Sequence, residues 1–147
     1  MRPDFSIRLA TEQDAESIAR LSAVLGYDTS AEAMRRRLGP ALKSEADLVL
    51  AAVRADGAML GWLQAHAAHI IESGFRVEIT GLVVAPEVRR GGVGRALVAA
   101  AEEWARKRSA TVLVVRSNIQ RPESHQFYPA LGFTTSKTQI VYRKPLK

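Results

Sequence analysis

Residues 81–97 constrain the fold of this chain more strongly than any other stretch of its sequence. An apolar run from Gly81 to Ala85 ends at Pro86, a turn rich in glycine and arginine follows, and a helical pattern begins directly after it. Glycines let a backbone approach a ligand closely, and the first N–H groups of a helix have no partners within the helix. The helix dipole adds partial positive charge at the same place. This segment therefore predicts a strand–turn–helix unit that binds a phosphate or pyrophosphate.

The spacing of the glycines excludes two common phosphate-binding loops. A Walker loop ends in Gly-Lys-Ser/Thr, and no lysine follows Gly94. A dinucleotide-binding loop has the pattern G-x-G-x-x-G with an acidic residue about 20 positions later. Here the glycines stand at 91, 92 and 94, and the next apolar run, Thr111 to Val115, is followed by Arg116.

Three blocks of sequence, in a consistent order and spread over nearly the whole chain, resemble one protein family. Arg89, Gly92 and Gly94 match an Arg/Gln-x-x-Gly-x-Gly/Ala signature. Asn118 and residues 125–133 resemble an Asn…Phe-Tyr-x-x-Leu-Gly-Phe element, and residues 7–14 resemble the strand and helix that open the family fold. On these blocks the chain resembles the GNAT superfamily of acetyl-coenzyme A-dependent N-acetyltransferases.

The resemblance implies a three-layer α/β/α fold with a central mixed sheet of six to seven strands and about four helices. It implies a single N-acetyltransferase domain over residues 1–147 that transfers an acetyl group from acetyl-CoA to a primary amine by direct attack in a ternary complex. The alternative is a non-catalytic module that binds acyl-CoA as a sensor or partner protein. The acceptor amine, on a small molecule or a protein, cannot be read from the sequence.

The resemblance also assigns residues to coenzyme binding. The pantetheine arm would pair with the backbone of Leu82, Val83 and Val84, where one N–H group would polarise the thioester carbonyl. Gly81 suggests a bulge that frees such a group, and Asn118 would bond the pantetheine or the following helix. The pyrophosphate would lie on the loop and first helical turn, formed by Arg89, Arg90, Gly91, Gly92, Val93, Gly94 and Arg95.

Two residues are candidates for proton transfer. A phenol, with a pKa of about 10, can protonate a thiolate whose parent thiol has a pKa of about 8.5, so the resemblance makes Tyr128 the general acid. Glu78 is the candidate general base, and strand periodicity puts its side chain on the same face as Leu82 unless the bulge intervenes. Glu72, water, and an ion-paired structural role for Glu78 are the alternatives.

Sequence patterns predict the order of elements β-α-α-β-β-β-α-β-α-β. We expect the second helix to begin near Ser30 and to be disturbed at Gly39-Pro40. The helix after the phosphate loop would bury Val93, Leu97, Ala100 and Trp104, which recur at helical spacing. The predicted strands are Phe5–Leu9, Asp47–Arg54, Met59–Ala67, Phe75–Ala85, Thr111–Val115 and Thr138–Arg143.

Composition excludes several other classes of function. The absence of cysteine excludes disulfides, thiolate metal sites and a cysteine nucleophile, and three scattered histidines argue against a metal site. The net charge of +6 is compatible with nucleic-acid binding, but no interleaved aromatic residues accompany the basic cluster Arg35-Arg36-Arg37, so we expect no nucleic-acid partner. No apolar run approaches the roughly 20 residues of a membrane span, and no signal-peptide pattern occurs. We therefore expect a cytoplasmic protein without a membrane partner, and homodimer formation is a further expectation.

Overall fold

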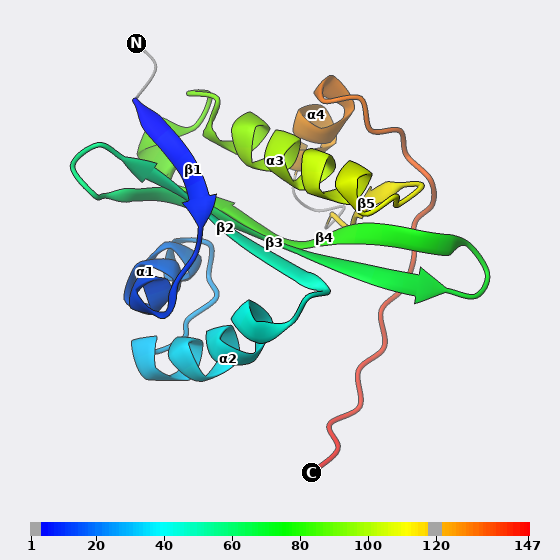
Figure 1. Cartoon of the computed structure of the whole chain (residues 1–147), viewed down its shortest axis with the longest axis horizontal. Helices are drawn as coiled ribbons and strands as arrows, with labels where there is room; N and C mark the ends of the chain where they lie inside the picture. Colours follow the sequence, from blue (N-terminus) through cyan, green and yellow to red (C-terminus); the bar gives the residue numbers. More distant parts are fainter. Residues whose placement is uncertain (1–3, 118–121) are drawn as a thin grey trace. The chain divides into compact units, whose positions relative to one another are not determined.

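The computed structural model describes residues 4–117 and 122–147, which form two compact units (Figure 1). The larger unit spans Met1–Arg116 and the smaller unit spans Ser117–Lys147. The larger unit holds the sheet and three helices, and the smaller unit holds the fourth helix and the C-terminal segment.

The sheet of the larger unit has five strands in the order β1-β2-β3-β4-β5. All neighbouring strands are antiparallel except β4 and β5, which are parallel as predicted from the strand–helix–strand order. The strands are β1 (Phe5–Leu9), β2 (Asp47–Arg54), β3 (Met59–Ile70), β4 (Gly74–Val84) and β5 (Leu113–Val115). The sheet is therefore mixed, as expected.

The expected count of six to seven strands is wrong, because the described residues form five. The missing strand is the one predicted at Thr138–Arg143, which lies in a stretch, 133–147, without helix or strand. Its alternating pattern and its β-branched and aromatic residues suit a strand, but strand propensity reflects packing against neighbours rather than an intrinsic backbone preference. Ile140 and Tyr142 keep 78% and 88% of their surface exposed, so the neighbour that would order them is missing.

Helices cover both faces of the sheet, which gives the larger unit three layers (Figure 1). The helices α1 (Ala15–Val24) and α2 (Ala31–Lys43) lie on one face, and α3 (Val93–Lys107) lies on the other. Ser30 caps α2, since its hydroxyl oxygen accepts a hydrogen bond from the Ala33 N–H at 3.0 Å. The expected disturbance at Pro40 does not end the helix, which continues to Lys43.

The core contains one apolar layer on each face of the sheet. On the α3 side, Leu63, Val77, Val93 and Leu97 are fully buried. On the other side, Ala15, Ile18, Leu38 and Val49 form a cluster against which Trp62 packs.

The predicted buried face of α3 is only partly right. Val93 and Leu97 are buried as expected, but Ala101 and Ala105 are buried in place of Ala100 and Trp104. The Arg108 guanidinium lies over the Trp104 ring, 4.2 Å from its centroid. The helix is rich in alanine on several sides, so its pattern alone does not define one face.

The smaller unit contains α4 (Pro122–Ala130), which ends in a turn at Gly132 with φ 96°. The N–H groups of Leu131 and Phe133 donate to the Tyr128 carbonyl at 3.0 and 3.1 Å.

None of the helices in the described part of the chain has the length and apolar composition that a membrane span requires.

Candidate active site

The loop between β4 and α3 has the geometry of an anion site. A short 3-10 turn, η2 (Pro86–Val88), follows β4, and Gly92 then caps α3 with φ 89°, a left-handed conformation that favours glycine. The first bond within the helix runs from the Ala96 N–H to the Gly92 carbonyl at 3.0 Å. The three preceding N–H groups, of Val93, Gly94 and Arg95, therefore stand at the positions that helix geometry leaves without a partner inside the helix.

Not every residue predicted for the phosphate loop can donate its backbone N–H to a ligand. The Arg89 N–H donates to the Pro86 carbonyl at 3.3 Å, and the Gly91 N–H donates to the Val88 carbonyl at 3.0 Å. These bonds hold the loop in shape. The N–H groups of Arg89 and Gly91 are thus used within the loop, and the donors for an anion are to be sought among the other predicted residues, including the first turn of α3.

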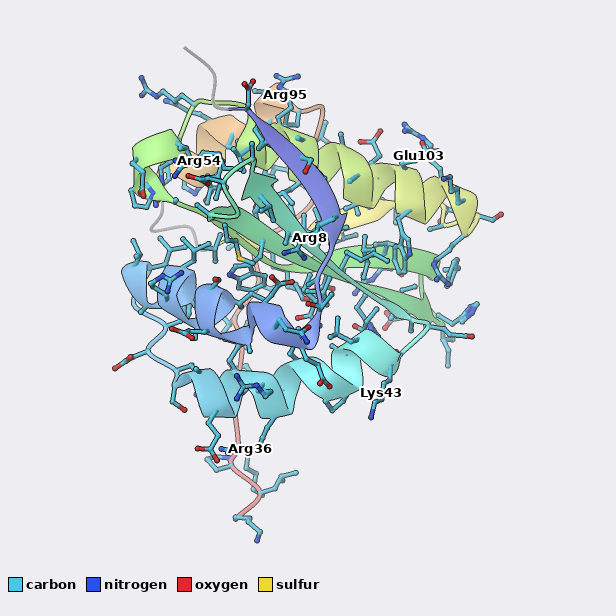
Figure 2. All side chains as sticks on the ribbon, turned by 60° about the vertical axis from the view of Figure 1, so that its left-hand side comes forward. Arg8, Arg36, Lys43, Arg54, Arg95 and Glu103 are labelled. Carbon is cyan, nitrogen blue, oxygen red and sulfur yellow. The ribbon has the colours of Figure 1, made fainter. Side chains whose placement is uncertain are left out.

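The side chains of Arg89, Arg90 and Arg95 are exposed around this turn, where they add positive charge. Arg90 adopts φ 69°, a left-handed conformation that costs a non-glycine residue free energy. Arg95 projects from the first turn of α3 at the upper end of the view in Figure 2.

Gly61 on β3 brings the first turns of α3 close to the sheet. A Cβ atom at Gly61 would lie 2.8 Å from the Val83 carbonyl oxygen, 3.2 Å from Val93 Cγ1 and 3.3 Å from Leu97 Cδ1. Only glycine fits this approach. Gly61 was not among the residues predicted for the site, although an isolated glycine inside a strand pattern is a signal of close backbone approach.

The β5-facing edge of β4 is open beyond Ile79. The parallel pairing of β4 with β5 covers only Val77–Ile79, and within the described residues no strand pairs with this edge further on. The two strands therefore diverge where the coenzyme's pantetheine arm was predicted to lie.

Hydrogen bonding decides which residues of β4 face the open edge. The Ala85 N–H donates to the Leu60 carbonyl on the β3 side at 2.8 Å. Backbone groups of successive residues alternate between the two edges of a strand, so the groups of Val84 and Leu82 point to the open edge and those of Val83 point to β3. Of the three residues predicted to pair with pantetheine, Leu82 and Val84 are placed to do so, whereas Val83 is not.

The bulge predicted at Gly81 is present. The register pairs Gln64 with Gly81 and Ala65 with Ile79, so Thr80 is an extra residue in β4. This extra residue shifts the alternation by one position, which is why Leu82 and Val84 face the open edge.

Gly81 also makes room for a neighbour, the alternative role of such a glycine. A Cβ atom there would lie 2.8 Å from Cζ3 and Cη2 of the Trp62 ring. The two roles coexist at this position.

The bulge places Glu78 on the opposite face from Leu82, which corrects the expectation of a shared face. Leu82 is paired with Leu63, whereas Glu78 is paired with His66. Leu63 and His66 are three residues apart on β3, so their side chains lie on opposite faces. Glu78 is thus on the face of α1 and α2.

The Glu78 carboxylate is held by two arginines. Its Oε1 accepts a hydrogen bond from Arg76 Nη2 at 3.4 Å, and its Oε2 accepts one from Arg116 Nε at 3.1 Å. Its side chain is 22% exposed. The ion-paired role that the sequence left as an alternative is therefore realised, and any proton transfer by Glu78 would take place within this pair of guanidinium contacts.

Tyr128 lies in the smaller unit, on α4. Its ring makes edge contacts with the rings of Phe127 and Phe133. The centroid of the Tyr128 ring lies 4.9 Å from that of Phe127 and 5.6 Å from that of Phe133. Burial raises the pKa of the Tyr128 phenol, so the hydroxyl keeps its proton at neutral pH. Asn118, the other coenzyme contact predicted for this part of the chain, lies outside the described residues.

Glu72, the alternative base, is exposed in the turn between β3 and β4.

Within the described residues, no group of three His, Asp or Glu side chains could hold a metal ion.

Sequence reasoning missed Arg54, which the β2–β3 hairpin brings to the phosphate-loop side of the unit (Figure 2). Asp56, through a hydrogen bond, and more weakly Glu87 of the loop raise the pKa of the Arg54 guanidinium. The electrostatic contribution of Glu87 shows that the hairpin and the loop are neighbours, a proximity that no local pattern encodes.

Known proteins share both the sequence and the fold. The chain is 30% identical over 146 residues to an aminoglycoside N(6')-acetyltransferase type 1 of Stenotrophomonas maltophilia, covering 97% of this chain and 94% of that protein. It is 30% identical over 136 residues to an aminoalkylphosphonate N-acetyltransferase of Salmonella typhimurium, and the match covers 91% of this chain and 88% of that protein. The crystal structure of an aminoglycoside N-acetyltransferase, AAC(6')-Iy, in complex with CoA superposes on this structure with a TM-score of 0.85 at 23% identity. The match covers 96% of this chain and 95% of that chain.

The family match spans the strand, loop and helix described above. The model of the acetyltransferase (GNAT) family matches residues 13–133, which include β4, the start of α3 and Tyr128. The match covers most of the chain, and the open edge of β4 beside an anion-binding helix start suits a long phosphorylated co-substrate. The chain therefore belongs to the acetyltransferase (GNAT) family, and it is an acyltransferase whose co-substrate is acetyl-CoA.

Proposed function

We propose that this enzyme transfers the acetyl group of acetyl-CoA to the primary amine of a small molecule by direct attack in a ternary complex. The observation that carries the proposal is the open edge of β4 next to the first turn of α3. The two named relatives are enzymes that act on small amines. Their activity disfavours the alternative of a non-catalytic sensor.

The donor site follows from the geometry of the larger unit. The pyrophosphate of acetyl-CoA accepts hydrogen bonds from the N–H groups of Val93, Gly94 and Arg95, while the nearby arginines neutralise its charge. The pantetheine arm pairs with the outward backbone groups of Leu82 and Val84. One of these N–H groups polarises the thioester carbonyl and stabilises the oxyanion that forms when the amine attacks.

Two residues supply proton transfer in this proposal. Glu78 provides the negative charge that receives the acceptor ammonium and begins its deprotonation, directly or through water. Tyr128 protonates the departing thiolate, a role supported by the family pattern and by the raised pKa that keeps its phenol protonated. No covalent acyl-enzyme is needed, and the chain has no cysteine to form one.

The acceptor class is narrowed by charge. Aminoglycosides carry several ammonium groups, whereas aminoalkylphosphonates carry one amine and an anionic group. Glu78 is already paired with two guanidinium groups, and Asp47 on the same face is paired with His66. Arg76 and Arg116 beside Glu78 would repel the further ammonium groups of a polycation and attract an anionic group, so we favour an amine that carries a single positive charge and an anionic group.

A thiol-release assay tests the function. Purified enzyme is given acetyl-CoA and either 2-aminoethylphosphonate or kanamycin, and free coenzyme is measured with a chromogenic disulfide. The chain has no cysteine, so the protein contributes no thiol background. We expect saturable, amine-dependent thiol release that is faster with the phosphonate. The absence of amine-dependent release across a wider panel of amines would refute the function.

Glu78→Gln tests the base. This change keeps the shape of the side chain and removes its charge, so we expect kcat/KM to fall by about 10²-fold, with an altered acidic limb of the pH–rate profile. Glu72→Gln is the matched control and should leave the profile unchanged. The reverse pattern, with loss in the Glu72 variant alone, would transfer the role to Glu72.

Tyr128→Phe tests the acid. Removing the hydroxyl should lower kcat by about 10²-fold and leave acetyl-CoA affinity intact, because the interaction matters only as charge develops on sulfur. The loss should shrink with an acyl donor whose thiol is more acidic. Tyr142→Phe, the same change at an exposed tyrosine, is the control. A Tyr128→Phe enzyme with normal kcat, when chemistry limits turnover, would leave Tyr128 a packing residue.

A further inference from the structure

Three ionisable side chains form one row across the sheet, on the face of α1 and α2. The register pairs Asp47 on β2 with His66 on β3, and it pairs His66 with Glu78 on β4. Residues directly opposite each other on antiparallel strands have Cβ atoms about 4.5–5.5 Å apart. The imidazole of His66 therefore stands between a carboxylate on each side, and one of these is the proposed base.

Asp47 fixes the orientation of the His66 ring. Its Oδ1 lies 3.0 Å from His66 Nδ1, and the Asp47 side chain is only 14% exposed. The Gln64 amide also approaches this oxygen, at 3.5 Å. A carboxylate only accepts hydrogen bonds, so Nδ1 carries the hydrogen and Nε2 presents a lone pair. The His66 side chain is 46% exposed, so the imidazole is accessible to a proton donor and to water.

Glu78 acts in this proposal as the anion that receives the ammonium, and a second group can carry the proton away. Both of its oxygens accept charge-assisted hydrogen bonds, from Arg76 at 3.4 Å and from Arg116 at 3.1 Å. A proton that stayed on Glu78 would weaken both bonds. The carboxylate is suited to receive an ammonium group, whereas an imidazole is the side chain that takes up and releases protons near neutral pH.

We propose that His66, oriented by Asp47, accepts the proton that the acceptor ammonium loses beside Glu78 and passes it to solvent. This inference rests on the proposed acetyl transfer to an amine. Asp47 from β2 contacts the ring, Glu78 on β4 stands opposite His66 in the register, and Arg76 on β4 and Arg116 after β5 bind the Glu78 carboxylate. His66 is thus a proton-relay residue, and Asp47 is its positioning residue.

The balance of the reaction requires such a route. An ammonium acceptor and acetyl-CoA yield an amide, free coenzyme thiol and one proton. The new N–C bond forms as the C–S bond breaks. One N–H proton leaves before attack, and a second leaves the nitrogen after attack. The thiolate gains one proton, so one proton is released to solvent in each turnover, and His66 carries that proton and returns to its neutral form.

His66→Gln tests the relay, and His69→Gln is the matched control. His69 lies on the same strand, but its ring is 4.5 Å from the Phe75 ring and outside the row. With 2-aminoethylphosphonate, and with kanamycin in parallel, we expect His66→Gln to lower kcat/KM about tenfold near pH 7. The loss should vanish near pH 10, where the free amine is abundant. His69→Gln should follow wild type throughout.

The outcomes separate the relay from the proposed function. A wild-type enzyme that acetylates neither probe nor any amine of the panel overturns the proposed function and the relay with it. If the wild type is active and the pH dependence of kcat/KM has the same shape in His66→Gln as in the wild type, the relay alone is overturned. This holds whether the two curves coincide or differ by a constant factor.

A second measurement needs no acceptor. Nitrogen NMR of the histidine-labelled protein should show His66 with hydrogen on Nδ1 when the ring is neutral, and Asp47→Asn should abolish that preference. A preference for hydrogen on Nε2 in the wild type would overturn the assignment. Asp47→Asn should also reproduce the pH-dependent loss of His66→Gln, and the unfolding midpoint of each variant confirms that it is folded.

Discussion

Replacing Gly61 with alanine tests whether the sheet sets the position of the phosphate-binding helix. The added Cβ would stand 2.8 Å from the Val83 carbonyl oxygen, about 0.6 Å short of the 3.4 Å at which ordinary contact begins. That oxygen belongs to a strand backbone and cannot rotate away. The same Cβ would press on Val93 and Leu97 of α3 at 3.2 and 3.3 Å. These two side chains must give by a few tenths of an ångström, and we expect the first turn of α3 to move outward with them.

The expected loss of stability is about 1–3 kcal/mol, the usual cost of overpacking a dense core. For a chain of this size that corresponds to a fall in Tm of roughly 5 °C. The displaced first turn of α3 should also weaken acetyl-CoA binding about tenfold, or about 1.4 kcal/mol. Urea unfolding measures the first effect and titration calorimetry with acetyl-CoA measures the second.

Gly74→Ala is the matched control. Gly74 has φ 91°, and no atom lies within 4 Å of the place that an added Cβ would take, so alanine there costs conformational free energy alone. The control should lose about 1 kcal/mol of stability and keep its affinity for acetyl-CoA. If Gly61→Ala unfolds at the same urea concentration as wild type, the close approach is wrong. If it is destabilised but binds acetyl-CoA as Gly74→Ala does, the helix position does not govern the phosphate site.

Two further predictions concern a strained loop and a partly buried ion pair. Arg90→Gly should raise the free energy of unfolding by about 1 kcal/mol, because glycine relieves the left-handed φ. The same change should weaken acetyl-CoA binding by about 1–3 kcal/mol, because it removes a positive charge. If urea unfolding and calorimetry show that stability and affinity both rise or both fall, the prediction is wrong. Asp14 accepts hydrogen bonds from both terminal nitrogens of Arg8 at 2.8 Å, which chiefly lowers the pKa of Asp14. Because the pKa of Asp14 is lower in the folded state, the ion pair stabilises the protein at pH values above the unfolded-state pKa, near 3.8. This contribution is lost as the pH falls below that pKa and the carboxylate becomes protonated. The stability advantage of wild type over Asp14→Asn should therefore be constant from pH 5 to 7 and shrink below about pH 4, and an advantage independent of pH would refute the pairing.

Local sequence signals were sufficient for most of the elements. The strands β1 and β2 have the predicted bounds, and α2 begins after Ser30 as expected, because strand alternation and a helix cap depend on a few adjacent residues. The strand–turn–helix unit of the predicted phosphate loop was also readable, because a glycine turn before a helical pattern is a local signal. The bulge at Gly81 belongs to this group as well, since it was inferred from a glycine inside a strand.

Contacts between distant segments decided the rest. The pattern at Thr138–Arg143 suits a strand, but a strand forms only where a neighbour offers backbone partners, and its sequence does not name one. The alanine-rich surface of α3 allows several buried faces, and packing against Gly61 selects one of them.

The sequence alone determined the family, the phosphate loop and the identities of the candidate acid and base, because these depend on residue types at short spacing. Only the tertiary structure decided that Glu78 is held between Arg76 and Arg116, and that Asp47 and His66 complete a row beside it. These partners lie up to 38 positions apart in the chain. Their meeting is set by strand register, and a single bulge residue, Thr80, shifts that register by one and decides which backbone groups face the open edge of β4.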